Sequence, residues 1–98
     1  MAETVELVRF TVDPDRREEF LRLRPAAINA LRSAHGGLIE AWLVEQDDGT
    51  FVDLVHWRSR EEAVAAAAAF PQIQAAQEWL STIAEVNELV HATLVDAR

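Results

Sequence analysis

The amino-acid sequence predicts an α+β fold, in which one four-stranded antiparallel sheet carries its helices on one face. Three observations predict it: strand-like runs near both ends of the 98-residue chain, a hairpin signal between two apolar runs, and helical periodicity on either side of that hairpin. The order strand, helix, strand, strand, helix, strand is ferredoxin-like (βαββαβ) and folds most economically as a single sheet. Because a chain of this length has room for one thin core, we expect residues 1–98 to form a single domain.

Residues 4–12 predict the first strand, because β-branched and aromatic residues dominate this run and an Asp-Pro pair stops it. A helix should follow, capped either by Asp13 or by Asp15. Its apolar residues recur at helical spacing until Gly36-Gly37, where glycine typically ends a helix. Pro25 lies inside this pattern and predicts a kink, because proline removes one backbone hydrogen bond.

Two further apolar runs, residues 38–46 and 51–58, predict the second and third strands. The segment between them contains Asp48-Gly49, a pair typical of tight hairpin turns because glycine tolerates a positive φ. These two strands should therefore be antiparallel neighbours in the sheet.

The second helix should begin at Ser59, which forms a capping-box pattern with Glu62, and should end near the helix-breaking Pro71. A further helical stretch then precedes the last strand, residues 86–95. The alanine run 63–69 predicts either a close contact between this helix and the sheet or a pocket beneath it. We expect the close contact, because empty apolar volume destabilises a fold by about 24 cal/mol per Å³.

Both alternating sets of side chains are apolar on every predicted strand, as Val5 and Leu7 against Val8 and Phe10 illustrate. A sheet face exposed to water should instead carry polar residues at every second position. Burying an apolar face of about 400 Å² contributes about 10 kcal/mol of hydrophobic free energy, which is comparable with the total stability of a small domain. We therefore expect a homodimer whose two sheets pack face to face. The alternative is a third layer formed by residues 72–85 of the same chain.

The composition excludes several classes of function. A net charge of −8, from 17 acidic and nine basic residues, is unsuited to binding nucleic acid. The absence of cysteine removes disulfides, thiolate nucleophiles and cysteine-ligated metals, and the three histidines are too scattered to predict a metal site. The chain start has the wrong charge pattern for a signal peptide, and no apolar run is long enough to span a membrane. We expect a cytoplasmic protein without a membrane partner.

Three segments resemble the antibiotic biosynthesis monooxygenase (ABM) group of the dimeric α+β barrel superfamily: VELVRFTVDPDRREEFLRL, DDGTFVDLVHWRSREEA and EVNELVHATLV. The most specific element is a strand ending in Trp57, followed by Arg58-Ser59 and a capped helix. The resemblance implies a dimeric α+β barrel. It also implies a cofactor-independent monooxygenase-like protein acting with O₂ on a small aromatic or polyketide-type substrate. The alternative is a non-catalytic module of the same fold, for small-ligand binding or dimerisation.

Several active-site residues of relatives are missing from this sequence. Where haem-degrading relatives carry an asparagine, a tryptophan and a histidine, this chain has Leu7, Ala66 and Gln77. Quinol-oxidising relatives commonly carry a glutamate where this chain has Val55, and histidines where its second helix has alanines. The chain also contains no tyrosine. We therefore expect no haem or other cofactor, and the resemblance does not itself identify the catalytic residues.

Cofactor-free oxygenation requires an apolar cavity, a base, and a donor for the resulting oxyanion. His56 and His91 are the candidate catalytic bases, because imidazole titrates near neutral pH, although either could be a structural histidine. Arg9 and Asp53 lie in the middle of strands that should be neighbours, which predicts an ion pair. This pair either fixes the strand register or contacts the substrate.

The remaining candidate substrate-binding residues are apolar. Trp42, Trp57 and Trp79 could stack on a flat aromatic ligand, and Ala66 would line a pocket beneath the alanine run; core packing is the alternative for all four. Glu6, Glu40 and Glu88 also interrupt apolar strands and are further candidate bases if they are buried.

Overall fold

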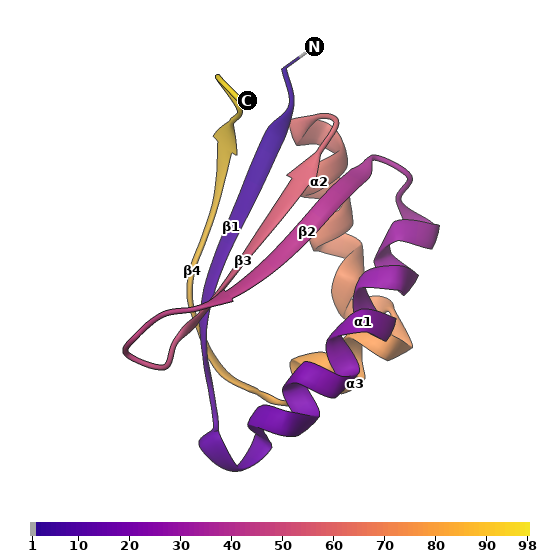
Figure 1. Ribbon diagram of the computed structural model, residues 1–98. Helices are drawn as coiled ribbons and strands as arrows, with labels where there is room; N and C mark the ends of the chain where they lie inside the picture. Colours follow the sequence, from indigo (N-terminus) through magenta and orange to yellow (C-terminus); the bar gives the residue numbers. More distant parts are fainter. Residues whose placement is uncertain (1) are drawn as a thin grey trace.

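The computed structural model describes residues 2–98 and contains the predicted α+β architecture (Figure 1). Its elements are β1 (Thr4–Val12), η1 (Pro14–Arg16), α1 (Arg17–Ala34), β2 (Leu38–Glu45), β3 (Phe51–Trp57), α2 (Arg60–Ala69), η2 (Phe70–Gln72), α3 (Gln74–Leu80) and β4 (Ile83–Thr93). The strands form one antiparallel sheet in the order β2-β3-β1-β4, so the ferredoxin-like topology is confirmed. Within residues 2–98, no helix combines the length and the apolar character needed to cross a membrane.

Asp13, the first of the two predicted caps, caps the turn η1 before α1, whereas α1 itself begins after Arg16 without a side-chain cap. The Asp13 carboxylate accepts a hydrogen bond of 2.9 Å from the backbone N–H of Asp15, and the short 3-10 turn η1 leads into the helix. α1 then continues across Pro25 without interruption and ends where the His35 N–H bonds to the Leu31 carbonyl oxygen.

The central hairpin and the Ser59 half of the capping box form as their sequence signals predict. Gly49 adopts a φ of +89°, which favours glycine, in the turn between β2 and β3. At the start of α2 the Ser59 hydroxyl accepts a hydrogen bond of 3.2 Å from the Glu62 N–H. The Glu62 carboxylate accepts hydrogen bonds from Arg58 and from the Ser59 hydroxyl.

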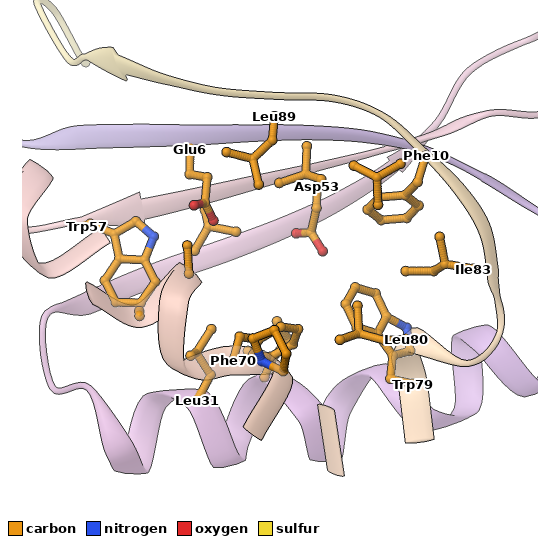
Figure 2. A pocket seen from close by; sticks show the side chains of 17 residues that line it. Glu6, Phe10, Leu31, Asp53, Trp57, Phe70, Trp79, Leu80, Ile83 and Leu89 are labelled. Atoms are coloured by element: carbon orange, nitrogen blue, oxygen red, sulfur yellow. The ribbon is translucent and has the colours of Figure 1, made fainter. Parts of the chain in front are cut away.

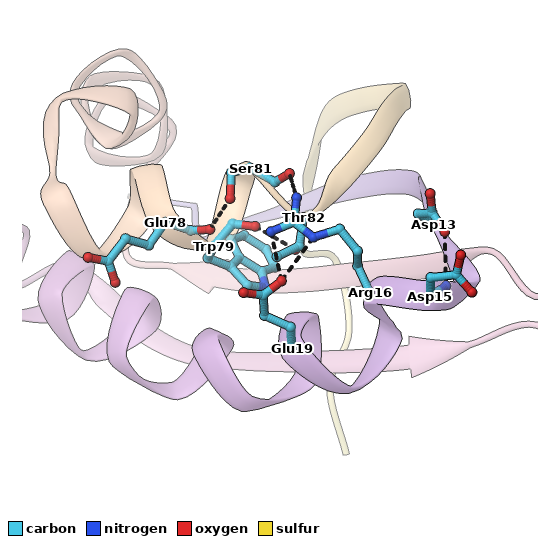
Figure 3. Close-up of polar contacts among 8 residues, drawn as sticks. All are labelled: Asp13, Asp15, Arg16, Glu19, Glu78, Trp79, Ser81 and Thr82. Atoms are coloured by element: carbon cyan, nitrogen blue, oxygen red, sulfur yellow. Dashed lines mark hydrogen bonds and ion pairs between the residues drawn. The ribbon is translucent and has the colours of Figure 1, made fainter.

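The last strand differs from its predicted bounds, because β4 begins at Ile83 instead of Val86 and ends at Thr93. The difference arises at the end of α3, where the Ser81 and Thr82 hydroxyls donate to the carbonyl oxygens of Glu78 and Trp79 (Figure 3). Side chains that bond to nearby backbone in this way compete with helix propagation. The turn is held to the start of α1 by Arg16, whose Nη1 donates to the Ser81 carbonyl oxygen at 2.7 Å.

The three α-helices cover one face of the sheet, which we call the helix face, and leave the other, the open face (Figure 1). Because α3 packs beside α1, the segment 72–85 does not form the alternative third layer over the open face. The strand register places apolar side chains at most open-face positions: Val5, Leu7, Trp42, Val44, Val52, Leu54, Val90 and Ala92. The prediction that both faces of the sheet are apolar is therefore confirmed.

Candidate functional site

A cavity of about 200 Å³ lies between the helix face of the sheet and the helices (Figure 2). The residues that line it are Glu6, Val8, Phe10, Ile28, Leu31, Asp53, Val55, Trp57, Ala66, Ala67, Phe70, Pro71, Trp79, Leu80, Ile83, Val86 and Leu89. Val86 and Leu89 on the edge strand β4 are about half exposed, so the cavity is accessible along this edge. Within an otherwise apolar wall, Glu6 and Asp53 supply the carboxylates.

The alanine run contributes to both arrangements that the sequence left open. Ala63 is fully buried against Leu31 and Trp57, as expected for close packing of α2 on the sheet. Ala66 belongs to the same buried cluster and also lines the cavity, as Ala67 does. Close packing and a neighbouring cavity therefore both occur along this run.

The antiparallel register directs both carboxylates into the cavity. Glu6 on β1 lies opposite Val55 on β3, and Asp53 lies opposite Val8. The two acidic residues are therefore diagonal neighbours on the helix face, separated by one step of each strand. Figure 2 shows their carboxylates on the same side of the sheet.

Glu6 is 8% exposed, and its Oε2 lies 2.9 Å from Nε2 of His91, its direct partner on β4. Burial raises the pKa of the Glu6 carboxyl, an effect that the charge and hydrogen bond of His91 oppose and the nearby Asp53 reinforces. A carboxylate with a raised pKa is a stronger base than an exposed one and is suited to taking a proton from a bound ligand.

Asp53 is 3% exposed and forms a two-point ion pair with Arg24 on α1, with Nη2–Oδ1 and Nε–Oδ2 distances of 2.7 and 3.2 Å. Burial raises the pKa of Asp53, and the hydrogen bonds and charge of Arg24 partly offset this effect. The pair connects α1 to β3 beside the cavity, so its geometry fixes the position of the Asp53 carboxylate.

The predicted ion pair between Arg9 and Asp53 is wrong. Their strands are neighbours as expected, but the residue opposite Asp53 is Val8, and Arg9 lies opposite Val52. The Arg9 side chain therefore belongs to the open face, where its Nη2 lies 3.6 Å from Glu88.

Two buried indole N–H groups at the cavity have no hydrogen-bond partner among residues 2–98. They belong to Trp57 and Trp79, which are 1% and 4% exposed. Trp79 is held by Phe10 and Phe20, with ring centroids 5.8 and 5.4 Å away. In Figure 2 the indole nitrogen of Trp57 lies on the side of its ring that faces Glu6. An unpaired buried donor costs about 1–3 kcal/mol, so an acceptor oxygen of a ligand would be favoured here.

The structure divides the predicted site residues between the two faces of the sheet. Asp53, Trp57, Ala66 and Trp79 line the cavity, and His91 contacts it through Glu6. His56, Trp42 and Arg9 lie on the open face instead. There His56 Nε2 contacts Glu3 at 2.7 Å and its ring stacks on Trp42 at a centroid distance of 6.4 Å.

Sequence reasoning left Glu6 as one of three possible acidic bases and missed Arg24. The available signal for Glu6 was its position along β1. In the observed antiparallel register, this position faces the same side of the sheet as Asp53 on β3. For Arg24 the signal was the isolated Asp53 within an apolar strand, which needs a cation if it is buried.

Among the described residues, no group of three or more histidine and acidic side chains is arranged to hold a metal ion. The ionisable groups at the cavity are instead engaged in pairs, Glu6 with His91 and Asp53 with Arg24. This arrangement can take a proton from a ligand and can offer an indole N–H to the resulting oxyanion.

Comparison with known proteins gives one family match and many structural similarities. The family model for "Antibiotic biosynthesis monooxygenase" (ABM) matches residues 4–79. No curated protein matches the sequence significantly. A protein of Bordetella bronchiseptica, provisionally named an antibiotic biosynthesis monooxygenase, has a TM-score of 0.76 and 20% identity, with 97% of this chain and 99% of that chain covered.

Two further solved structures share the fold. SnoaB, a cofactor-independent oxygenase from Streptomyces nogalater, has a TM-score of 0.69 and 17% identity, with 100% of this chain and 96% of that chain covered. Rv0793 from Mycobacterium tuberculosis has a TM-score of 0.61 and 22% identity, with 99% of this chain and 97% of that chain covered. At these identities the similarity shows the common fold.

Proposed function

This chain belongs to the antibiotic biosynthesis monooxygenase family, and on that premise we propose that it oxidises a small hydroxylated aromatic molecule with O₂ and without a cofactor. The observation that carries the proposal is the Glu6 carboxylate, buried in the wall of an apolar cavity that the unpaired indole N–H of Trp57 also lines (Figure 2). SnoaB, which has the same fold, is a cofactor-independent oxygenase.

The size of the cavity supports a small aromatic or polyketide-type substrate. An apolar cavity of about 150 Å³ is sufficient to bind benzene. The cavity here, at about 200 Å³, is larger and opens at β4, so it suits a ligand of one or two rings with its remaining atoms toward solvent. The aromatic rings of Phe10 and Trp79 supply flat walls for such a ligand.

The proposed reaction needs a base, an oxyanion donor and molecular oxygen. Glu6 takes a proton from the substrate and leaves an electron-rich anion, whose oxygen accepts a hydrogen bond from Trp57. The anion transfers one electron to O₂, and the two radicals combine through a new C–O bond. The proton returns to give a hydroperoxide. Loss of water breaks the O–O bond and the remaining C–H bond, so one oxygen atom stays in a new carbonyl group.

Oxygen uptake and ligand binding together test this function. We expect the purified protein to bind anthrone or 1,4-dihydroxynaphthalene in calorimetry and to accelerate oxygen consumption above the protein-free rate. Binding without accelerated consumption across a panel of phenols, hydroquinones and anthrones would indicate a ligand-binding module instead. If the protein neither binds these compounds nor accelerates oxygen consumption, the proposed site is contradicted.

We further propose that the functional unit is a homodimer in which two open faces pack against each other. The open face has apolar residues on all four strands, and Trp42, Val44 and Val90 are each more than two-fifths exposed within the chain. Apolar patches of this kind on soluble domains mark interaction surfaces. A second copy offers a surface of the same size and composition, and its sheet can pack at the usual spacing of about 10 Å.

Substitution of Leu54 by glutamate should separate this dimer, because it places a charge in the middle of the open face. In sedimentation at micromolar concentration we expect wild type at twice the 11.0 kDa chain mass and the variant at 11.0 kDa. The matched control is Val64→Glu on the exposed side of α2, which should remain dimeric. A wild-type protein that sediments as a monomer would contradict the dimer.

A further inference from the structure

Glu6 and His91 form an isolated buried pair. Among residues 2–98, the imidazole of His91 is the side chain that hydrogen-bonds the Glu6 carboxylate, with Nε2–Oε2 at 2.9 Å. The two side chains are 12% and 10% exposed, and the residues are directly opposed on β4 and β1. Glu6 lines the cavity and His91 does not, so a ligand in the cavity meets the carboxylate first.

A carboxylate alone is a weak base for a phenol. Imidazoles in peptides hold a proton about two pH units more tightly than carboxyl groups do. Burial raises the pKa of the Glu6 carboxyl, and this carboxyl is in direct contact with an imidazole that can take up a proton. Transfer of the proton to the imidazole also creates a hydrogen bond between two opposite charges, which is roughly twice as strong as a neutral one.

We propose that His91 is the terminal proton acceptor of the site and that Glu6 relays the substrate proton to it. This inference rests on the proposed function. The substrate O–H or C–H bond breaks and its proton goes to Oε1 of Glu6. At the same time the proton shared between Oε2 and Nε2 moves onto Nε2 of an imidazole that carries hydrogen on Nδ1. No electron moves in this transfer, and the proton later returns to the peroxide by the same path. Since His91 does not touch the substrate, it is a relay and positioning residue.

The relay can be observed in the unmodified protein with 4-nitrophenol as the probe, because the phenolate of this one-ring phenol is coloured. At a pH where the free probe is mostly protonated, we expect the bound probe to absorb as phenolate. In ¹⁵N-labelled protein, the imidazole nitrogens of His91 should then shift to the positions of an imidazolium. His35 at the end of α1 and His56 on the open face are internal controls whose signals should not change.

A His91→Gln variant gives a second readout, because glutamine can still donate a hydrogen bond to Glu6 but cannot accept the proton. We expect its fraction of bound phenolate to fall about tenfold to a hundredfold, in line with the ordinary difference between imidazole and carboxyl groups. The matched control His35→Gln should bind as much phenolate as wild type.

Two results would overturn the relay while leaving the proposed function intact: a neutral His91 in the phenolate complex, or undiminished phenolate in His91→Gln. Failure of wild type to form any bound phenolate would overturn the proposed function and the relay together.

Discussion

Replacement of Glu6 by glutamine is expected to lower kcat for oxygen-dependent oxidation by about 10²- to 10⁴-fold, the usual contribution of a positioned general base. Glutamine has nearly the same shape as glutamate and retains a hydrogen-bonding oxygen, so the cavity should keep its volume and the ligand its affinity. The loss should therefore fall on kcat, with KM changed little. The measurement is the initial rate of oxygen consumption at saturating substrate.

The matched control is Glu18→Gln, which changes an exposed glutamate in the first turn of α1 and should leave the rate unchanged. A Glu6→Gln variant with at least a third of the wild-type kcat would show that Glu6 is not the base.

The same substitution should not destabilise the fold at neutral pH. Because burial raises the pKa of Glu6, the folded state binds this proton more tightly than the unfolded state. The contribution of Glu6 to wild-type stability therefore decreases as the pH rises from the ordinary carboxyl pKa through the raised one. Glutamine does not titrate, so Glu6→Gln should gain stability relative to wild type across that window. Thermal denaturation at several pH values measures this difference and also shows that the variant is folded.

Replacement of Arg24 by methionine is expected to cost about 3–5 kcal/mol of unfolding free energy at neutral pH, because it leaves the Asp53 carboxylate buried without its cation. Methionine keeps much of the arginine stem, so the loss reports mainly on charge. Urea denaturation measures the change as a shift of the transition midpoint.

Two controls identify the cause of this loss. Arg22→Met removes an exposed arginine from the same helix and should change the unfolding free energy by less than about 0.5 kcal/mol. The double variant Arg24→Met/Asp53→Leu replaces both partners with apolar residues and should recover most of the stability, because no charge is left buried. If Arg24→Met is no more destabilising than Arg22→Met, the pair does not anchor α1 to β3.

The fold could be predicted from the sequence because its signals are local. The Asp48-Gly49 turn, the Ser59 cap and the bounds of β1 each depend on residues adjacent in the chain. The end of α3 was less predictable, because the Ser81 and Thr82 hydroxyls bond to helical carbonyl groups and end the helix. As a result, β4 begins earlier than the apolar pattern suggests.

The site was less predictable because it depends on strand register, which a single sequence does not specify. A shift of one residue exchanges the two faces of a strand. His56 and His91 are both mid-strand histidines, yet His56 lies on the open face and His91 beside Glu6 at the cavity. The same reason separates Arg9 from Asp53, and only the helix packing shows that Arg24 is the true partner.

We expect an aromatic substrate to bind in the cavity with its acidic hydroxyl or carbon beside Glu6. A crystal of the wild-type protein soaked without oxygen in 1,4-dihydroxynaphthalene should show this binding mode. Ligand density should lie between the sheet and the helices, with a ligand oxygen within hydrogen-bonding distance of the Glu6 carboxylate. Ligand found only on the open face, or in the cavity but turned away from Glu6, would contradict it.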